Sequence, residues 1–293
     1  MKKNNINVQE IIVGLMLVMA LIHYAGQILT TKKQVAPREI VMEAVPTASP
    51  SATPTAVITP KPLSSAERNR LYGPCVNLPV LMYHHVEREE EAVKNKRTGL
   101  NVPPEMFKKQ MTYLSENHFT TITPADLVNF FDYAKALPTK PIMITFDDGY
   151  VDVGDLAFPI MQELGIKATV YLPTGLMDNL DYLTWSKIEE MKSSELMTFG
   201  NHTWSHRNVG ADKEIVKYEI STADRQLAEK GLDEPKTFVY PYGLENFSTE
   251  KLLDEMGYKL AFTTVHGRML CEKQRLSLPR IRIGNAPLSV FGI

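Results

Sequence analysis

Two adjacent carboxylates, Asp147 and Asp148, follow the apolar run at 141–146, and two histidines, His202 and His206, occur further along the chain. The β-branched and aromatic residues of the run predict a buried strand, and α/β folds place their chemistry at the C-terminal tips of such strands. Neighbouring carboxylates repel each other, so they need a cation or a shared proton. One Asp and two neutral imidazoles can hold a divalent ion. The pattern predicts a hydrolytic metal site in which the second Asp is free to act as a base.

The two histidines belong to the segment 201–206, which we expect to leave a strand and enter a helix. If a helical turn has begun there, a spacing of four residues puts both imidazoles on one face. A histidine pair of this spacing is weak evidence for a metal site by itself. Joined to the two aspartates at another strand tip, it favours one divalent ion, and zinc fits these ligands best.

The elements that must position these residues alternate along the chain after Leu71. Strands alternating with helices indicate parallel pairing, and seven or eight such units predict an α/β fold closed into a distorted (β/α) barrel. An open doubly wound sheet is the alternative, although no Gly-rich phosphate loop follows a strand. The expected strands lie at 79–83, 119–122, 142–146, 168–172, 196–199, 237–240, 259–263 and 279–283, and the expected helices at 104–117, 124–136, 155–164, 184–192, 212–230 and 248–256.

The N-terminal part differs in composition from the rest. Residues 8–29 are mostly apolar and approach the roughly 20 residues that span a bilayer, so we expect a transmembrane anchor within 1–30. A cleaved signal peptide is the alternative, but its cleavage site would be a poor match. The Pro, Thr, Ser and Ala residues of 31–70 predict a disordered linker, which leaves 71–293 as the catalytic domain.

The net charge and the cysteine content bear on the possible partners and on the redox compartment. The chain has 32 Lys and Arg against 34 Asp and Glu, so its net charge of -2 gives no reason to expect nucleic acid as a partner. The two cysteines, Cys75 and Cys271, lie just before the first and last expected strands of the domain. They could form a disulfide if those strands are neighbours and the compartment is oxidising, or they could remain two thiols.

Three motifs together resemble those of the polysaccharide deacetylases, the family 4 carbohydrate esterases with a NodB homology domain. They are TFDDGY at 145–150, HTWSH at 202–206 and YPYG at 240–243, in the order and approximate spacing of the family. The segment LPVLMYHHV at 78–86 is similar to the branch that deacetylates poly-N-acetylglucosamine in biofilm matrices. The resemblance covers about 78–283.

For the metal and the base, the resemblance implies that Asp148, His202 and His206 are metal ligands and that Asp147 is the general base. It also implies that the backbone N–H of Tyr150 helps to bind the oxyanion.

For the acid and the substrate groove, the resemblance implies that His84 protonates the leaving amine. His85 is a weaker candidate because strand alternation lets only one of the two face the barrel axis, and His266 is the only late histidine. Pro241 and Tyr242 would shape one wall of the groove.

One departure from the family pattern concerns the Arg that orients the base. The Arg that commonly precedes the Pro-Tyr motif is absent, and Arg280 or Arg282 could replace it, since alternation sends both to one face of the last strand.

Taken together, these features predict a metal-dependent enzyme that removes acetyl groups from N-acetylglucosamine units of an extracellular polysaccharide, with poly-β-1,6-N-acetylglucosamine favoured. Membrane anchoring would place the catalytic domain on the extracytoplasmic side. Peptidoglycan or chitin oligomers are alternative substrates, and a non-catalytic glycan-binding domain is an alternative function. A glycosidase is disfavoured because adjacent aspartates at one strand tip do not straddle a glycosidic bond at the required separation of roughly 5 Å or more.

Overall fold

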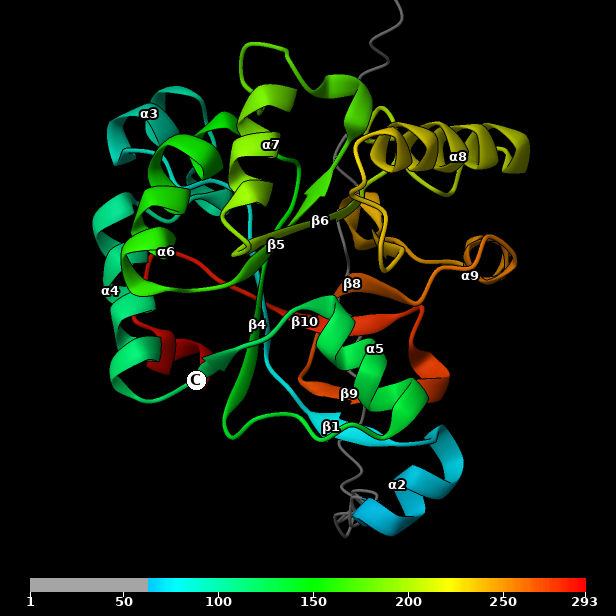
Figure 1. Cartoon of the computed structure of the whole chain (residues 1–293). Coiled ribbons are helices and arrows are strands. Elements are labelled where there is room, and N and C mark those ends of the chain that lie inside the picture. The colour runs from blue at the N-terminus through cyan, green and yellow to red at the C-terminus, as the bar shows by residue number, and fades with distance from the viewer. Residues whose placement is uncertain (1–62) are drawn as a thin grey trace, which may run out of the picture. The chain divides into compact units, whose positions relative to one another are not determined.

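Seven parallel strands close into a barrel in the computed structural model, which describes residues 63–293 (Figure 1). Around the ring, β2 is followed by β10, β8, β7, β6, β5 and β4, and β4 pairs back to β2. The ring strands are β2 (Val80–Tyr83), β4 (Pro141–Phe146), β5 (Ala168–Leu172), β6 (Met197–Asn201), β7 (Thr237–Val239), β8 (Leu260–His266) and β10 (Leu278–Arg282). The pairing of β4 with β2 confirms the distorted barrel and excludes the open doubly wound sheet.

The eighth expected strand, at 119–122, does not join the ring. It is present as β3 (Thr120–Thr121), which pairs only with the first two residues of β4. Further along β4, Thr145 and Phe146 pair with β5 instead. The barrel therefore has seven strands, with β3 as a short addition outside the ring.

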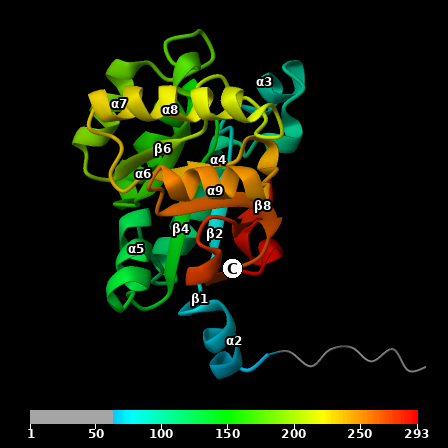
Figure 2. The same cartoon turned by 90° about the vertical axis from the view of Figure 1, so that its right-hand side faces the viewer.

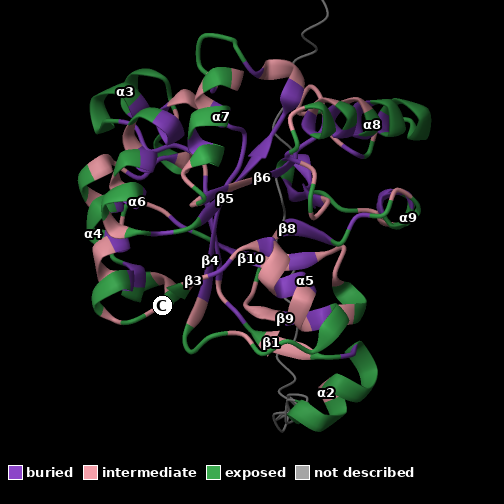
Figure 3. Ribbon diagram, in the orientation of Figure 1, coloured by how far each residue is buried: buried purple, intermediate pink, exposed green. Residues whose placement is uncertain are grey.

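The ring strands are buried along almost their whole length, and the helices cover the outside of the barrel (Figure 3). Such runs are typical of parallel strands that are covered on both faces. The covering helices are α4 (Pro104–Glu116), α5 (Pro124–Tyr133), α6 (Phe158–Leu164), α7 (Trp185–Ser193), α8 (Lys213–Glu229) and α9 (Phe247–Glu255).

Two helices differ from the ranges that the sequence suggested. A capping box between Thr123 and Asp126 begins α5, but the helix ends at Tyr133 because Ala134 takes a left-handed conformation with φ 53°. The helix expected at 155–164 begins as a π-helical turn at Val153–Ala157 before α6. Pro159 lies in the first turn of α6 and has no N–H to donate, which favours an irregular turn before it.

Two further helices precede or interrupt the alternating pattern. Helix α2 (Ser65–Tyr72) begins inside the range 31–70 that was expected to be linker, and a capping box between Ser64 and Glu67 starts it. Helix α3 (Glu89–Lys94) follows β2. Figure 2 shows α2 at the end of the domain that lies away from α7 and α8.

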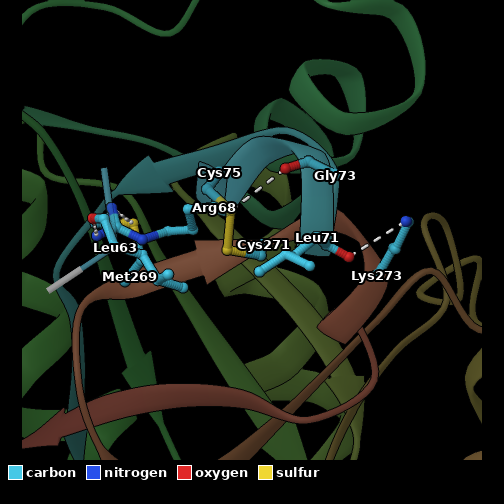
Figure 4. Close-up of a disulfide and its surroundings, with 8 residues drawn as sticks. All are labelled: Leu63, Arg68, Leu71, Gly73, Cys75, Met269, Cys271 and Lys273. Carbon is cyan, nitrogen blue, oxygen red and sulfur yellow. Dashed lines mark hydrogen bonds between the residues drawn. A yellow bond between two sulfur atoms is a disulfide. The ribbon is translucent and has the colours of Figure 1, made fainter. Parts of the chain in front are cut away.

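A two-stranded antiparallel sheet joins the two distant cysteines. Strand β1 (Cys75–Asn77) pairs with β9 (Met269–Cys271), and Cys75 lies directly opposite Cys271 (Figure 4). The two residues form a disulfide with a sequence separation of 196. Of the two alternatives left open by the sequence, the structure supports the disulfide, on strands of their own rather than on barrel strands.

The expected membrane anchor at 1–30 and residues 31–62 of the expected linker lie outside the described residues. Within 63–293, no helix is both long enough and apolar enough to cross a bilayer.

Candidate active site

The carboxyl ends of the barrel strands surround one cleft, and the polar residues expected there gather in it. The pairing of Tyr83 with Phe146 brings the ends of β2 and β4 together, so the residues that follow, His84 and Asp147, become neighbours. The lining residues are His84, Leu100, Asp147, Asp148, Tyr150, His202, His206, Tyr240, Tyr242, Gly243, Thr264 and Arg282.

Asp148, His202 and His206 converge as expected for metal ligands. Asp148 Oδ1 lies 3.2 Å from His202 Nε2 and 3.0 Å from His206 Nε2. Ligand atoms that share a tetrahedral zinc ion at about 2.0–2.1 Å lie roughly 3.3 Å apart, so these separations suit one ion. The three side chains form a group that could hold a cation.

The hydrogen bonds around the triad also fit a cation. His202 Nδ1 lies 2.6 Å from the carbonyl oxygen of Val239. Because a carbonyl only accepts, Nδ1 carries the proton and the lone pair of Nε2 faces Asp148. Asp148 Oδ1 is buried and has no hydrogen-bond partner in the described part of the chain. An unpartnered carboxylate oxygen opposite an imidazole lone pair is an arrangement that a bound cation satisfies.

The charge of Asp148 is favoured by its neighbours. Burial by itself raises the pKa of this carboxyl, but positive charge on the adjoining imidazoles of His202 and His206 outweighs burial and holds the pKa well below 3.8. A cation held between the three side chains would supply the same charge when the imidazoles are neutral. Asp148 is therefore ionised at neutral pH, as a ligand must be.

The segment 202–206 is a loop, so the expectation of a helical turn there is wrong. Thr203 and His206 have left-handed φ values of 64° and 58°, and α8 begins only at Lys213. The N–H of Thr203 donates to Asn201 Oδ1 at 2.7 Å, which turns the chain directly after β6. The two imidazoles, with ring centroids 4.8 Å apart, are thus brought together by backbone turns.

Asp147 is held by Arg280, which resolves the choice between Arg280 and Arg282. The two terminal nitrogens of the fully buried Arg280 each donate to one oxygen of Asp147 at 2.7 Å. Arg280 Nε donates to the carbonyl of Thr263 at 2.9 Å. Burial raises the pKa of Asp147, but Arg280 outweighs it and holds the pKa below 3.8. Arg282 lies on the same face of β10, at the rim of the cleft.

The two neighbouring histidines face different surroundings, as alternation predicted. His84 lines the cleft, with Nε2 3.9 Å from Asp147 Oδ2. Burial lowers its pKa below 6.5, although Asp147 and Asp148 oppose this. His85 is directed to Asp152, with Nδ1 2.7 Å from Oδ2.

The other expected residues differ in how they meet the cleft. Tyr150 and Tyr242 line it, and Tyr242 is 63% exposed with its ring edge-on to that of His206 at 4.7 Å. Pro241, which precedes Tyr242 in the sequence, is buried and is not among the lining residues. His266 lies at the exposed end of β8 and does not line the cleft.

Sequence reasoning missed three lining residues. Leu100 ends a short 3-10 helix (Thr98–Leu100) after α3, where no periodic pattern marks it, and Thr264 lies on β8 just beyond the range expected for that strand. Tyr240 belongs to the YPYG motif but was expected only as part of a strand. Knowledge of which strand ends share the rim would have been needed to find them.

Comparisons with known proteins agree with this geometry. The polysaccharide deacetylase family model matches residues 134–261. The poly-beta-1,6-N-acetyl-D-glucosamine N-deacetylase of Escherichia coli K12 is 27% identical over 251 residues, covering 71% of this chain and 36% of the E. coli protein. The chain thus spans little more than a third of that relative. The enzyme of the same name from Staphylococcus epidermidis is 22% identical over 231 residues, covering 70% of this chain and 78% of its own.

A solved structure has the same fold over most of the domain. The Streptococcus pyogenes deacetylase PplD in complex with acetate superposes with a TM-score of 0.65 at 29% identity, covering 72% of this chain and 93% of its own. Motifs, barrel and site geometry therefore agree with the family match. The chain belongs to the polysaccharide deacetylase family, with the motif pattern of its poly-N-acetylglucosamine branch, and it is a hydrolase of amide bonds.

Proposed function

We propose that this enzyme removes the N-acetyl group from N-acetylglucosamine units of an extracellular polysaccharide and releases acetate, with poly-β-1,6-N-acetylglucosamine as the favoured polymer. The observation that carries the proposal is the shared cleft, in which the Asp148 triad, the Arg280-bound Asp147 and His84 face one another. These are the groups that hydrolysis of an unactivated amide requires: a cation site, a base and an acid.

Asp148, His202 and His206 would hold the divalent ion, and zinc suits one carboxylate and two imidazoles. Such an ion supplies polarisation of the acetyl carbonyl and lowers the pKa of water toward neutrality. The Val239 carbonyl fixes the tautomer of His202, so this ligand is oriented by the protein itself.

Asp147 acts as the general base. Its low pKa keeps it ionised, and Arg280 binds both of its oxygens from within the barrel. The carboxylate can therefore only take its proton from the cleft side. A firmly oriented base that removes a proton from the attacking water contributes typically 10²- to 10⁴-fold to the rate.

Tyr150 and His84 act on the oxyanion and on the leaving amine, respectively. In the described residues, no protein acceptor takes the backbone N–H of Tyr150, so it is free to donate to the oxyanion that forms on the acetyl carbon. His84 donates a proton to the nitrogen of the sugar as the C–N bond breaks. The products are acetate and the free amine.

The choice of polymer rests on the names of the relatives. The E. coli and S. epidermidis proteins are both named as deacetylases of poly-β-1,6-N-acetyl-D-glucosamine. Tyr242 offers an exposed ring at the edge of the cleft, and such rings stack on sugar faces. We propose that Tyr242, backed by Pro241, forms one wall of the polymer groove.

We further propose that the catalytic domain works outside the cytoplasm, tethered by an anchor within residues 1–30. Its support is the apolar stretch at 8–29 and the pairing of Cys75 with Cys271, since disulfides persist mainly in oxidising compartments. Fractionation should recover the full-length chain with the membrane. A mature chain that begins after Ala25 and is free in the medium would contradict the anchor.

The test of substrate is acetate release by the full-length chain, with defined metal, from three polymers: poly-β-1,6-N-acetylglucosamine, peptidoglycan and chitin oligomers. We expect the β-1,6 polymer to be hydrolysed with the highest kcat/KM. Release from peptidoglycan or chitin alone would move the proposal to those substrates. No release from any of them, with metal bound, would contradict the deacetylase activity.

A further inference from the structure

A second polar cluster lies next to the cleft, and none of the steps above uses it. It consists of His85, Glu87 and Asp152, which are all buried. Glu87 Oε1 has no hydrogen-bond partner in the part of the chain that the structure describes. Three potential ligands in one place could in principle hold a second cation.

The distances argue against a cation in this cluster. His85 Nδ1 and Asp152 Oδ2 are 2.7 Å apart, which is shorter than the roughly 3.3 Å expected between two ligands of one zinc ion. The other oxygen of Asp152 accepts the N–H of Val86 at 2.6 Å. Asp152 is therefore satisfied by two hydrogen bonds, and the short contact to His85 is a hydrogen bond in which Nδ1–H donates.

His85 also contacts a residue of the active site, Tyr150, which lines the cleft. The rings of His85 and Tyr150 stack with centroids 3.6 Å apart and an angle of 18° between their planes. Tyr150 also stacks on Tyr182 at 5.4 Å. The backbones of Tyr150 and Tyr182 also form an antiparallel bridge, in which the N–H of Val151 donates to the carbonyl oxygen of Asp181 at 3.0 Å.

We propose that His85 is a positioning residue: Asp152 fixes its ring, and the ring fixes Tyr150 so that the Tyr150 N–H points at the developing oxyanion. The inference rests on the proposed function only in that an acyl carbon must be attacked in the cleft. His85 thus links the end of β2 to the turn after β4. Of the two neighbouring histidines, His84 is the acid and His85 positions the oxyanion donor.

A backbone N–H keeps its direction only if the residue that carries it is held in place. The turn at 148–150 contains left-handed residues, with φ 71° at Asp148 and 65° at Gly149, so its peptide planes depend on what holds them. Misplacement by about 1 Å can cost on the order of 10²-fold in rate. Two hydrogen bonds hold the backbone of this turn, from the Leu183 N–H to the Gly149 carbonyl at 2.9 Å and from the Val151 N–H to the Asp181 carbonyl at 3.0 Å, and the stacked ring of His85 holds the side chain of Tyr150.

Two substrates with different leaving groups distinguish the role of His85 from that of His84. An aryl acetate releases a stable phenolate and needs no acid, whereas the N-acetyl polymer needs one, and both form an oxyanion. We therefore propose measuring kcat and KM on both substrates with the full-length chain carrying His85→Ala, Tyr150→Ala or both changes. His84→Ala serves as the comparison, and zinc affinity is measured on every variant.

We expect His85→Ala and Tyr150→Ala each to lower kcat about 10- to 100-fold on both substrates, with KM and zinc affinity unchanged. Tyr150→Ala keeps its backbone N–H, so its loss reports positioning. The double variant should be no slower than the slower single variant, because both changes remove the same contact. His84→Ala should slow the polymer reaction far more than the aryl acetate reaction.

Several results would overturn the inference. One is a loss of kcat in the double variant that equals the product of the two single losses. Another is a loss of kcat in His85→Ala on the polymer alone, which would mean that His85 acts through His84. A third is weaker zinc binding by His85→Ala or Tyr150→Ala. His85→Phe keeps a stacking ring without the bond to Asp152, and it replaces His85→Ala in the cycle if the latter melts early; full activity in His85→Phe would remove Asp152 from the proposal. Aryl acetate turnover by wild type without acetate from any polymer would contradict the proposed function alone.

Discussion

At the scale of single residues, the two adjacent aspartates have different partners, and this divides their tasks. Asp147 faces Arg280 inside the barrel, whereas Asp148, with φ 71°, turns toward the two imidazoles. Both pKa values are lowered, but by a guanidinium in one case and by imidazoles in the other. The same residue type thus serves as a base and as a ligand because its surroundings differ.

The pairing of Arg280 with Asp147 predicts a pH dependence of stability. Because the folded pKa of Asp147 lies below its ordinary 3.8, the pair stabilises the folded state fully above that pH, and the stabilisation is lost as pH falls toward the folded pKa. Urea unfolding of metal-free wild type between pH 7 and 3 should show this loss.

Changing Arg280 should remove that dependence and reveal a buried charge. Arg280→Gln leaves Asp147 buried without its cation, so we expect a loss of roughly 3–5 kcal/mol in the free energy of unfolding at pH 7. The deficit should shrink at low pH, where Asp147 is protonated. Arg282→Gln, at the rim, is the matched control, and an equal loss in both variants would refute the assignment.

His84 predicts a second pH effect, on catalysis. As pH rises, His84 loses its proton, so kcat/KM for the polymer should fall, and burial places this limb below the ordinary pKa of 6.5 in the free enzyme. His84→Ala should keep its metal, lose about 10²- to 10⁴-fold in turnover and lose this limb of the profile. Near-normal turnover with an unchanged profile would show that another group is the acid.

At the scale of elements, hydrophobic periodicity was sufficient for most of the barrel but not for the loops. All eight expected strands are present, seven of them in the ring because their runs are apolar and short, and alternation correctly assigned His84 to the cleft. The loop at 202–206 could not be predicted, because left-handed conformations at Thr203 and His206 have no sequence signal of the kind that glycine gives. Helix α2, which buries no residue, lacks an apolar stripe.

The loop at 202–206 depends on a carboxylate from α8. Glu219 is buried and accepts the N–H groups of Trp204 at 3.1 Å and Ser205 at 2.7 Å, together with the Ser205 hydroxyl at 2.7 Å. Glu219→Ala should therefore free the loop that carries His206 and weaken zinc binding about 10- to 100-fold. Titration of zinc with a competing chelator measures this. Glu214→Ala, on the first turn of the same helix, should bind zinc like wild type, and equal weakening in both would contradict a specific role.

At the scale of the whole molecule, the disulfide lies at one end of the barrel and the cleft at the other. Strand β1 leads into the first residue of β2, whereas the site residues follow the strand ends. We expect the double variant Cys75→Ser/Cys271→Ser to lose about 2–5 kcal/mol in the free energy of unfolding, because a cross-link between distant residues restricts the unfolded chain. Its kcat and zinc affinity should remain those of wild type. An altered kcat in the folded variant would show that the two ends are coupled.

The central claim is that Asp148 holds a catalytic cation while Asp147 acts on the substrate water. The most direct test measures bound zinc per chain and acetate release from poly-β-1,6-N-acetylglucosamine on the same samples of wild type, Asp148→Ala and Asp147→Asn. Wild type should hold about one ion and release acetate, Asp148→Ala should lose most of both, and Asp147→Asn should keep the ion and lose turnover. Equal zinc occupancy in Asp148→Ala and wild type, or full turnover in Asp147→Asn, would contradict the account.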